Sequence, residues 1–133
     1  MNISVHRKGE ITASIRDPEV ARRVLRIIFE TILGRGGFTA FQYHLRRLLG
    51  RDPLEAFYER PREFYEGLEE FFGESGARVT FKVLCGKLIA LSGLEELTPD
   101  KLFEILMRDE VAAREIIVEM LAEILRRGEG GVT

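Results

Sequence analysis

The spacing of apolar and polar positions predicts a chain that is helical along most of its length. From residue 17 onward, apolar residues recur every three or four positions, which is the period of a helix that buries one face. We therefore expect an all-α fold, a single-domain bundle of six or seven helices. The expected helices lie near residues 18–33, 39–49, 53–59, 61–72, 78–91, 99–107 and 110–127.

Proline residues mark the expected helix starts. Pro18, Pro53 and Pro99 each follow an Asp or Thr, a residue whose side chain can cap the N-terminus of a helix. Pro61 stands at a further expected start, directly after an arginine. All four prolines of the sequence thus fall where a first helical turn is predicted, which makes the boundaries mutually consistent.

Both ends of the chain depart from the helical pattern. Residues 3–15 alternate apolar and polar positions around a polar turn, which predicts a short β-hairpin within residues 1–16. Because a two-stranded hairpin is marginally stable alone, it should lie on the helices or pair with a second chain. The glycine-rich residues 128–133 are expected to be a flexible tail, so residues 17–127 would form the helical bundle.

Composition excludes several classes of protein. The 133 residues are 45% hydrophobic and 32% charged, which suits one compact domain. No apolar run is long enough to cross a membrane and the first ten residues lack a secretory signal, so we expect a cytoplasmic protein without membrane contact. One cysteine and two histidines make a disulfide and a structural zinc site improbable, and we predict neither metal nor cofactor. Cys85 is expected to be a small core residue with a raised pKa.

The net charge of −2 hides an uneven distribution along the chain. Residues 1–51 carry ten Lys and Arg against four Asp and Glu, whereas residues 52–133 carry ten against eighteen. This polarity favours attraction inside the molecule, and it also suits head-to-tail self-association or an anionic partner. Sixteen of the twenty cations are arginines, a preference that fits a GC-rich or thermophilic source.

The helix expected at residues 39–49 carries a candidate binding surface. Its outward face offers amide, aromatic and guanidinium groups, the kinds that read base edges or hold phosphates, on the second helix of a helix-turn-helix-like arrangement. These residues are Gln42, Tyr43, Arg46 and Arg47. A solvated helix face is the simpler interpretation, and a pI of about 5.8 argues against nucleic acid as the preferred partner.

The buried side of the same helix is predicted to contain a core stripe with one histidine at its edge. The stripe consists of Phe41, Leu45, Leu48 and Leu49, and His44 borders it. His44 is a candidate polar site, and an enzyme with an unrecognised site near it is one alternative function. Hydrogen-bonded packing is the plainer interpretation, because no catalytic motif accompanies this residue.

The first helix is expected to pair most of its charges internally. Glu19 with Arg23 and Arg26 with Glu30 are four residues apart, the spacing of helical ion pairs. Arg22 and the loop residue Arg35 would then remain available to an outside anion.

Two later helices carry large apolar faces. Residues 57–72 hold half of all aromatic residues, which we interpret as core rather than as a platform for an apolar ligand. In the last helix the apolar arc covers more than half of the circumference, which indicates either a central helix or contact with a second subunit. The candidate interface residues are Arg114, Ile117, Leu121 and Leu125. They support a homodimer or another protein partner.

One stretch of about 35 residues resembles a known group of proteins. The matching positions are Tyr43-His44-Leu45, Leu49-Gly50, Asp52-Pro53, Glu55, Tyr58, Pro61, Phe64, Phe72-Gly73 and Gly76-Ala77. They resemble short archaeal helical proteins without assigned activity, related domains of which have been proposed as output modules of signalling proteins. The resemblance implies a regulatory or interaction domain and transfers no catalytic residue.

These observations lead to a prediction of function. The chain is expected to be a non-enzymatic binding or regulatory domain that acts through protein–protein interaction. The first alternative is a helix-turn-helix-like regulator that binds nucleic acid through Gln42, Tyr43, Arg46 and Arg47, and the second is the enzyme with a site near His44.

Overall fold

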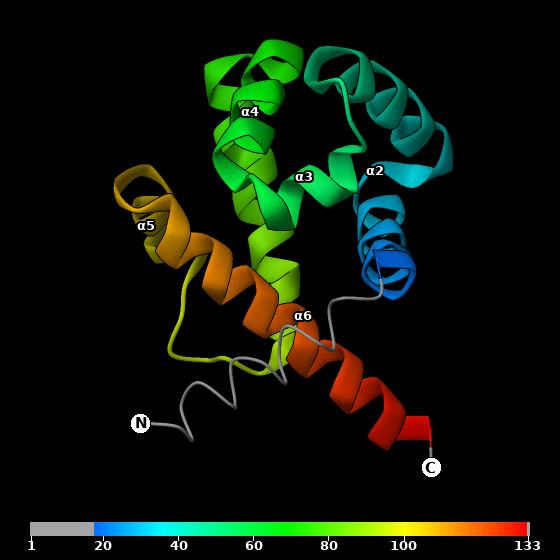
Figure 1. The fold of residues 1–133 in the computed structure, drawn as a ribbon, viewed down its shortest axis with the longest axis vertical. Helices are drawn as coiled ribbons and strands as arrows, with labels where there is room; N and C mark the ends of the chain where they lie inside the picture. Colours follow the sequence, from blue (N-terminus) through cyan, green and yellow to red (C-terminus); the bar gives the residue numbers. More distant parts are fainter. Residues whose placement is uncertain (1–17, 133) are drawn as a thin grey trace.

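A computed structural model describes residues 18–132, and these residues form five helices and no strand. The helices are α2 (Pro18–Leu49), α3 (Pro53–Glu59), α4 (Pro61–Ser92), α5 (Pro99–Arg108) and α6 (Glu110–Val132) (Figure 1). The all-α fold class is thus confirmed for the described residues. The predicted β-hairpin of residues 1–16 lies outside them.

The predicted count of six or seven helices was wrong, because two expected boundaries are bends inside longer helices. Gly34 bends α2 with φ 78° and ψ 164°, and Gly73 bends α4 with φ 83° and ψ 171°. Both glycines occupy a backbone region that is essentially closed to residues with a Cβ atom. A single residue in this conformation changes the direction of the chain, so the two turns of five residues that we expected, 34–38 and 73–77, are absent.

The helix starts were predicted better than the helix ends. Four of the five helices begin at a proline, as expected. Thr98 caps α5 by accepting a hydrogen bond from the Lys101 amide at 3.1 Å, and Asp109 caps α6 by accepting one from the Ala112 amide at 3.2 Å. At its other end α6 continues to Val132 instead of ending at residue 127. Glycine costs a helix about 1 kcal/mol relative to alanine without forbidding it, which is why this end was misplaced.

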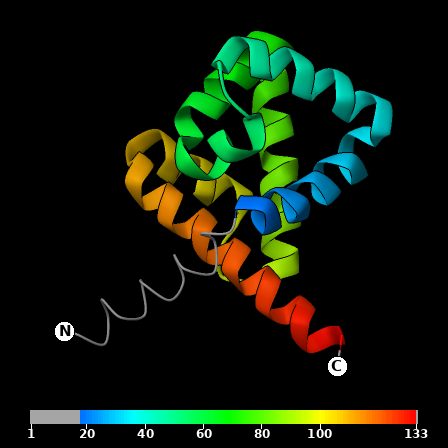
Figure 2. The same ribbon diagram turned by 45° about the vertical axis from the view of Figure 1, so that its right-hand side comes forward.

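α4 is the helix around which the others are arranged. It contacts each of the other four described helices, and Figure 1 shows it along the middle of the molecule, between α2 and α5. α6 crosses α4 and packs against α5 as well. The bend at Gly34 turns α2 into a V whose two arms, residues 18–33 and 35–49, are visible in Figure 2. Both α3 and α4 pack against α2.

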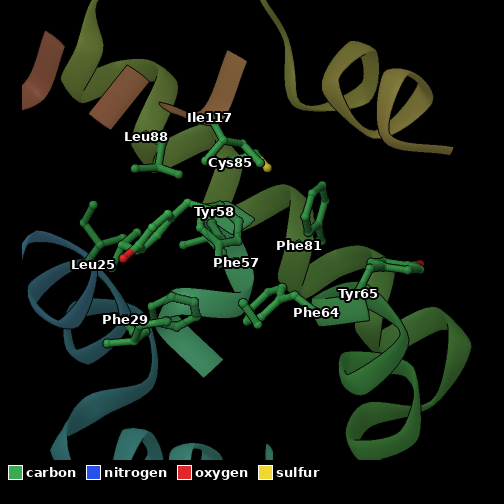
Figure 3. Close-up of a cluster of buried hydrophobic side chains, with 14 of the residues drawn as sticks. Leu25, Phe29, Phe57, Tyr58, Phe64, Tyr65, Phe81, Cys85, Leu88 and Ile117 are labelled. Carbon is green, nitrogen blue, oxygen red and sulfur yellow. The ribbon is translucent and has the colours of Figure 1, made fainter. Parts of the chain in front are cut away.

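The core between these helices is built largely of aromatic rings. Phe29, Phe57, Phe64 and Phe81 are at most 1% exposed, and the Phe57 and Phe64 ring centroids lie 5.2 Å apart. Figure 3 shows these four rings grouped between α2, α3 and α4. The interpretation of the aromatic stretch at residues 57–72 as core is therefore confirmed for its fully buried members.

Two further core predictions had different outcomes. Cys85 is fully buried, and burial raises the pKa of its thiol, as expected for a core cysteine. Leu48, by contrast, was wrongly placed in the core stripe of its helix, because it is 49% exposed. It lies in the last turn of α2 and lines an open groove between this turn and α4 instead of packing on the core.

Arginine side chains join helices by capping their C-termini. Arg62 of α4 donates a hydrogen bond to the backbone oxygen of Leu106 near the end of α5, at 2.8 Å. Arg127 of α6 donates one to the backbone oxygen of Leu91 near the end of α4, at 3.0 Å. The last carbonyl groups of a helix lack partners within it and carry partial negative charge, so a guanidinium stabilises them.

Candidate functional site

A groove with four arginines lies where the two arms of α2 meet the start of α3. Its volume is about 340 Å³. The lining residues are Glu19, Arg22, Arg23, Arg26, Gln42, Arg46, Asp52 and Leu54. We call it the arginine groove. With four guanidinium groups and two carboxylates, its lining carries a net charge of +2.

The groove follows from the amphipathic pattern on both sides of Gly34. Leu25 and Phe29 of the first arm, and Phe41 and Leu45 of the second, are at most 1% exposed. The helical period turns the charged residues of both arms away from this core. Because Gly34 bends α2 back on itself, polar residues from both arms line one groove.

Asp52 holds the groove together by using both carboxylate oxygens. Its Oδ1 accepts a hydrogen bond from the Leu54 amide at 3.1 Å and thereby caps α3. Its Oδ2 accepts a hydrogen bond from Nη1 of Arg22 at 3.2 Å, which forms an ion pair between α2 and α3. This hydrogen bond is the largest cause of a raised pKa at Arg22. The Asp52 side chain is only 10% exposed, so the contact is well enclosed on that side.

The expected pairing of charges on the first arm was wrong. Glu19 forms its ion pair with Arg22 at 3.7 Å, and Arg22 is the cation engaged by carboxylates rather than the available one. Arg23 and Arg26 form no ion pair with another residue of the described part, and neither does Arg46. Asp52 and Glu19 both pair with Arg22, so the guanidinium that was expected to be available joins the two elements α2 and α3 instead.

The four residues of the predicted binding surface divide between two places. Gln42 and Arg46 line the arginine groove. Tyr43 and Arg47 form a separate pair, in which Nη1 of Arg47 donates a hydrogen bond to the Tyr43 hydroxyl at 3.2 Å. The guanidinium carbon also lies 5.7 Å from the centre of the Tyr43 ring. The outward face of this arm thus offers two surfaces of different chemistry.

His44 lies on the surface among aromatic rings. Its ring centroid is 5.3 Å from that of Phe71 and 5.4 Å from that of Tyr43, and its side chain is exposed. It lines neither the arginine groove nor the acidic groove described next. A cleft that joins His44 to a buried carboxylate, which the enzymatic alternative requires, is therefore not formed by these two grooves.

A second groove has the opposite charge. It has a volume of about 610 Å³ and is lined by Leu48, Leu49, Glu63, Glu66, Gly67, Glu69 and Glu70, from the end of α2 and the first part of α4. We call it the acidic groove. Among the residues that the structure describes, no three His, Cys, Asp or Glu side chains are placed to hold a metal ion.

The candidate interface on the last helix is largely enclosed by the chain itself. Ile117 and Leu121 are 0% exposed, so assigning them to a contact with a second subunit was wrong. Leu125 is half-buried against the core, and Arg114 is exposed and donates to the backbone oxygen of Glu59 at 3.5 Å. The wide apolar arc is explained by packing of α6 on α4 and α5. The homodimer stays a prediction without an assigned interface.

Comparison with known proteins adds no homologue. The chain matches no protein-family model, no curated protein and no solved structure. The resemblance of residues 43–77 to short archaeal proteins therefore stays a prediction. Within residues 18–132, no helix has the length and apolar character needed to cross a membrane.

Sequence reasoning missed Arg23 and Arg26 as members of a site, and it expected Arg22 to meet an anion without placing it in a groove. Their spacing in the sequence suggested helical ion pairs, and Asp52, thirty residues from Arg22, was assigned only to capping. The available signal was the bend: a glycine-rich stretch between two amphipathic segments brings polar faces from both sides together.

Proposed function

We propose that this chain is a non-enzymatic binding domain that acts through protein–protein interaction and takes an acidic segment of its partner in the arginine groove. The observation that supports the proposal is the set of three guanidinium groups, of Arg23, Arg26 and Arg46, that line one groove without an ion pair to another described residue. Arginine forks bind carboxylates through two parallel hydrogen bonds, which gives such a groove both affinity and geometric selectivity.

The arrangement of charges favours recognition of a short acidic segment. The ion pair between Arg22 and Asp52 joins α2 to the start of α3 and lines the groove. This part of the groove therefore exists before a partner binds. A preformed site avoids part of the ordering cost of binding. Since the arginines that line the groove are mostly exposed, salt should weaken the interaction strongly.

The test is fluorescence anisotropy with a short labelled peptide of alternating Glu and Ser, at low and at high salt. We expect saturable binding at low salt that weakens as salt is added. The double variant Arg26→Gln/Arg46→Gln should abolish binding, whereas Arg47→Gln, which removes a neighbouring arginine outside the groove, should retain it. Equal binding by both variants, or no binding by the unaltered chain, would contradict the proposal.

The alternative is a nucleic-acid binder, which is favoured by Gln42 and Arg46 lying in the same groove as Arg23 and Arg26. It ranks second because a net charge of −2 and a pI of about 5.8 give the chain little overall attraction for a continuous phosphate backbone. A labelled DNA duplex retained in a salt-sensitive manner, and lost in an Arg46→Glu/Arg47→Glu variant, would replace the first proposal by this one.

A further inference from the structure

We infer that the arginine groove is a phosphate-binding site whose ligand is a phosphate monoester, carried by a phosphorylated side chain or by a small phosphate ester. The inference rests on the proposed function, because it concerns the same groove, and it makes the ligand chemistry specific. Charge balance, the supply of hydrogen-bond donors and the size of the groove support it.

Charge balance distinguishes a phosphate monoester from a carboxylate. The groove lining carries a net charge of +2. A phosphate monoester carries about −1.5 to −2 near neutral pH, whereas a carboxylate carries only one negative charge. A single phosphate monoester therefore neutralises the groove almost completely, and a single Glu or Asp side chain leaves about half of the positive charge in place.

Asp52 does not compete with a ligand for the guanidinium groups of Arg23, Arg26 and Arg46. Both oxygens of Asp52 are already engaged, one by the Leu54 amide and the other by Arg22. The guanidinium groups of Arg23, Arg26 and Arg46 remain as donors. Three oxygens of a phosphate can each accept hydrogen bonds from these groups, and charge-assisted bonds of this kind are roughly twice as strong as neutral ones.

The size of the groove is sufficient for one phosphate group together with part of the molecule that carries it. A volume of about 340 Å³ is near the lower end for small-molecule sites and corresponds to roughly ten water molecules. Gln42 on the second arm adds an amide that can donate to a phosphate oxygen or to the atom that links it to the rest of the ligand.

The decisive experiment is calorimetric titration of the full chain with four probes. They are a capped neutral peptide with one phosphoserine, the same peptide with Glu at that position, glycerol phosphate, and a short DNA duplex. We expect the phosphoserine peptide or glycerol phosphate to bind at least about tenfold more tightly than the Glu peptide. The phosphorylated probe that binds identifies the source of the phosphate.

Variants locate the binding. Arg46→Gln and Arg26→Gln should each weaken binding of the phosphorylated probe by about tenfold or more, the size of a charge-assisted hydrogen bond. Arg47→Gln should change it less than about twofold, because Arg47 contacts Tyr43 outside the groove. All three arginines are exposed, so circular dichroism should show that each variant keeps its helices.

The outcomes separate this inference from the function on which it rests. Equal affinity for the phosphoserine and Glu peptides overturns the inference and leaves an acidic-segment binder standing, and so does binding of the Glu–Ser peptide alone. Unchanged affinity in Arg26→Gln and Arg46→Gln overturns the assignment to the groove. Absence of binding to every peptide and to glycerol phosphate overturns both proposals, and binding of the duplex alone replaces both with the nucleic-acid alternative.

Discussion

Single residues in this protein serve two purposes at once, and Asp52 is the clearest example. One carboxylate oxygen caps α3 and the other holds Arg22 of α2. Each of these hydrogen bonds of Asp52 contributes to the free energy of unfolding. Together they also hold α2 and α3 in the positions that form the groove.

Replacing Asp52 should therefore have graded effects. Asp52→Ala removes the cap and the ion pair, and we expect it to lower the free energy of unfolding by about 1 to 3 kcal/mol. Asp52→Asn keeps a capping oxygen while it loses the charge, so its effect should be less than half as large. Urea denaturation followed by circular dichroism measures both. Equal losses in the two variants would show that the cap contributes nothing.

Tyr58 predicts how stability responds to alkaline pH. Burial raises the pKa of its hydroxyl to about 12, against about 10 in the unfolded chain. Between these values the unfolded state loses this proton before the folded state does, so the free energy of unfolding falls as pH rises from 10 to 12. The stabilisation is complete below pH 10, and the loss by pH 12 should be about 2 kcal/mol.

Two variants isolate the effect of Tyr58 from that of other alkaline groups. Tyr58→Phe should lack this part of the alkaline loss in denaturation curves measured at pH 9 and pH 11.5. Tyr43→Phe, which changes a ring that is 57% exposed, should retain it. If the pH dependence of Tyr58→Phe equals that of the unaltered chain, the assignment to Tyr58 is wrong.

At the scale of elements, the bend in α2 depends on one backbone conformation. Gly34 has φ 78° and ψ 164°, and a Cβ atom built there would meet no other atom within 4 Å. A substitution at this position is therefore opposed by the backbone alone and not by crowding. Gly36, two residues later, is helical and equally open, which gives a matched comparison within the same helix.

The two glycines should respond to alanine in opposite directions. Gly34→Ala forces a residue with a Cβ atom into a conformation that costs about 1 to 3 kcal/mol, and we expect a destabilisation of that size. Gly36→Ala should instead stabilise the chain by about 0.5 to 1 kcal/mol, since alanine favours the helix. Thermal denaturation of both variants provides the measurement. A stabilising Gly34→Ala would mean that α2 is not bent at this residue in solution.

At the scale of the whole molecule, the arrangement around α4 predicts cooperative unfolding. Every other described helix contacts α4, so none can keep its packing when α4 unfolds. Cys85 lies on α4 and is fully buried. Its thiol should react with a disulfide reagent only when this core opens.

We therefore expect one unfolding transition by all probes. In increasing urea, loss of helical circular dichroism and gain of Cys85 reactivity should share a midpoint and a slope. A destabilising substitution outside α4, such as Asp52→Ala, should shift both denaturation curves to lower urea by the same amount. Separate midpoints would show that part of the molecule unfolds while the core around Cys85 remains closed.

The sequence predicted local features better than contacts between distant segments. Prolines placed four helix starts correctly, and the aromatic stretch was recognised as core, because both signals act within a few residues. The bend at Gly34 could not be told from a loop, since glycine permits either. The pairing of Arg22 with Asp52 and the burial of Ile117 depend on how the helices pack against one another. The apolar period of a single helix does not predict that packing.

The arginine groove is lined by a short part of the chain, and its arginines lie on the side of that part that faces away from the core. All of its lining residues lie between positions 19 and 54, and three of its four arginines are exposed, whereas the helix that contacts all others spans residues 61–92. Evolution can therefore change the arginines of the groove with small effects on folding. Descendants of this chain that keep the core and lose these arginines would share the architecture and recognise different partners. Divergence of specificity should consequently outpace divergence of the fold.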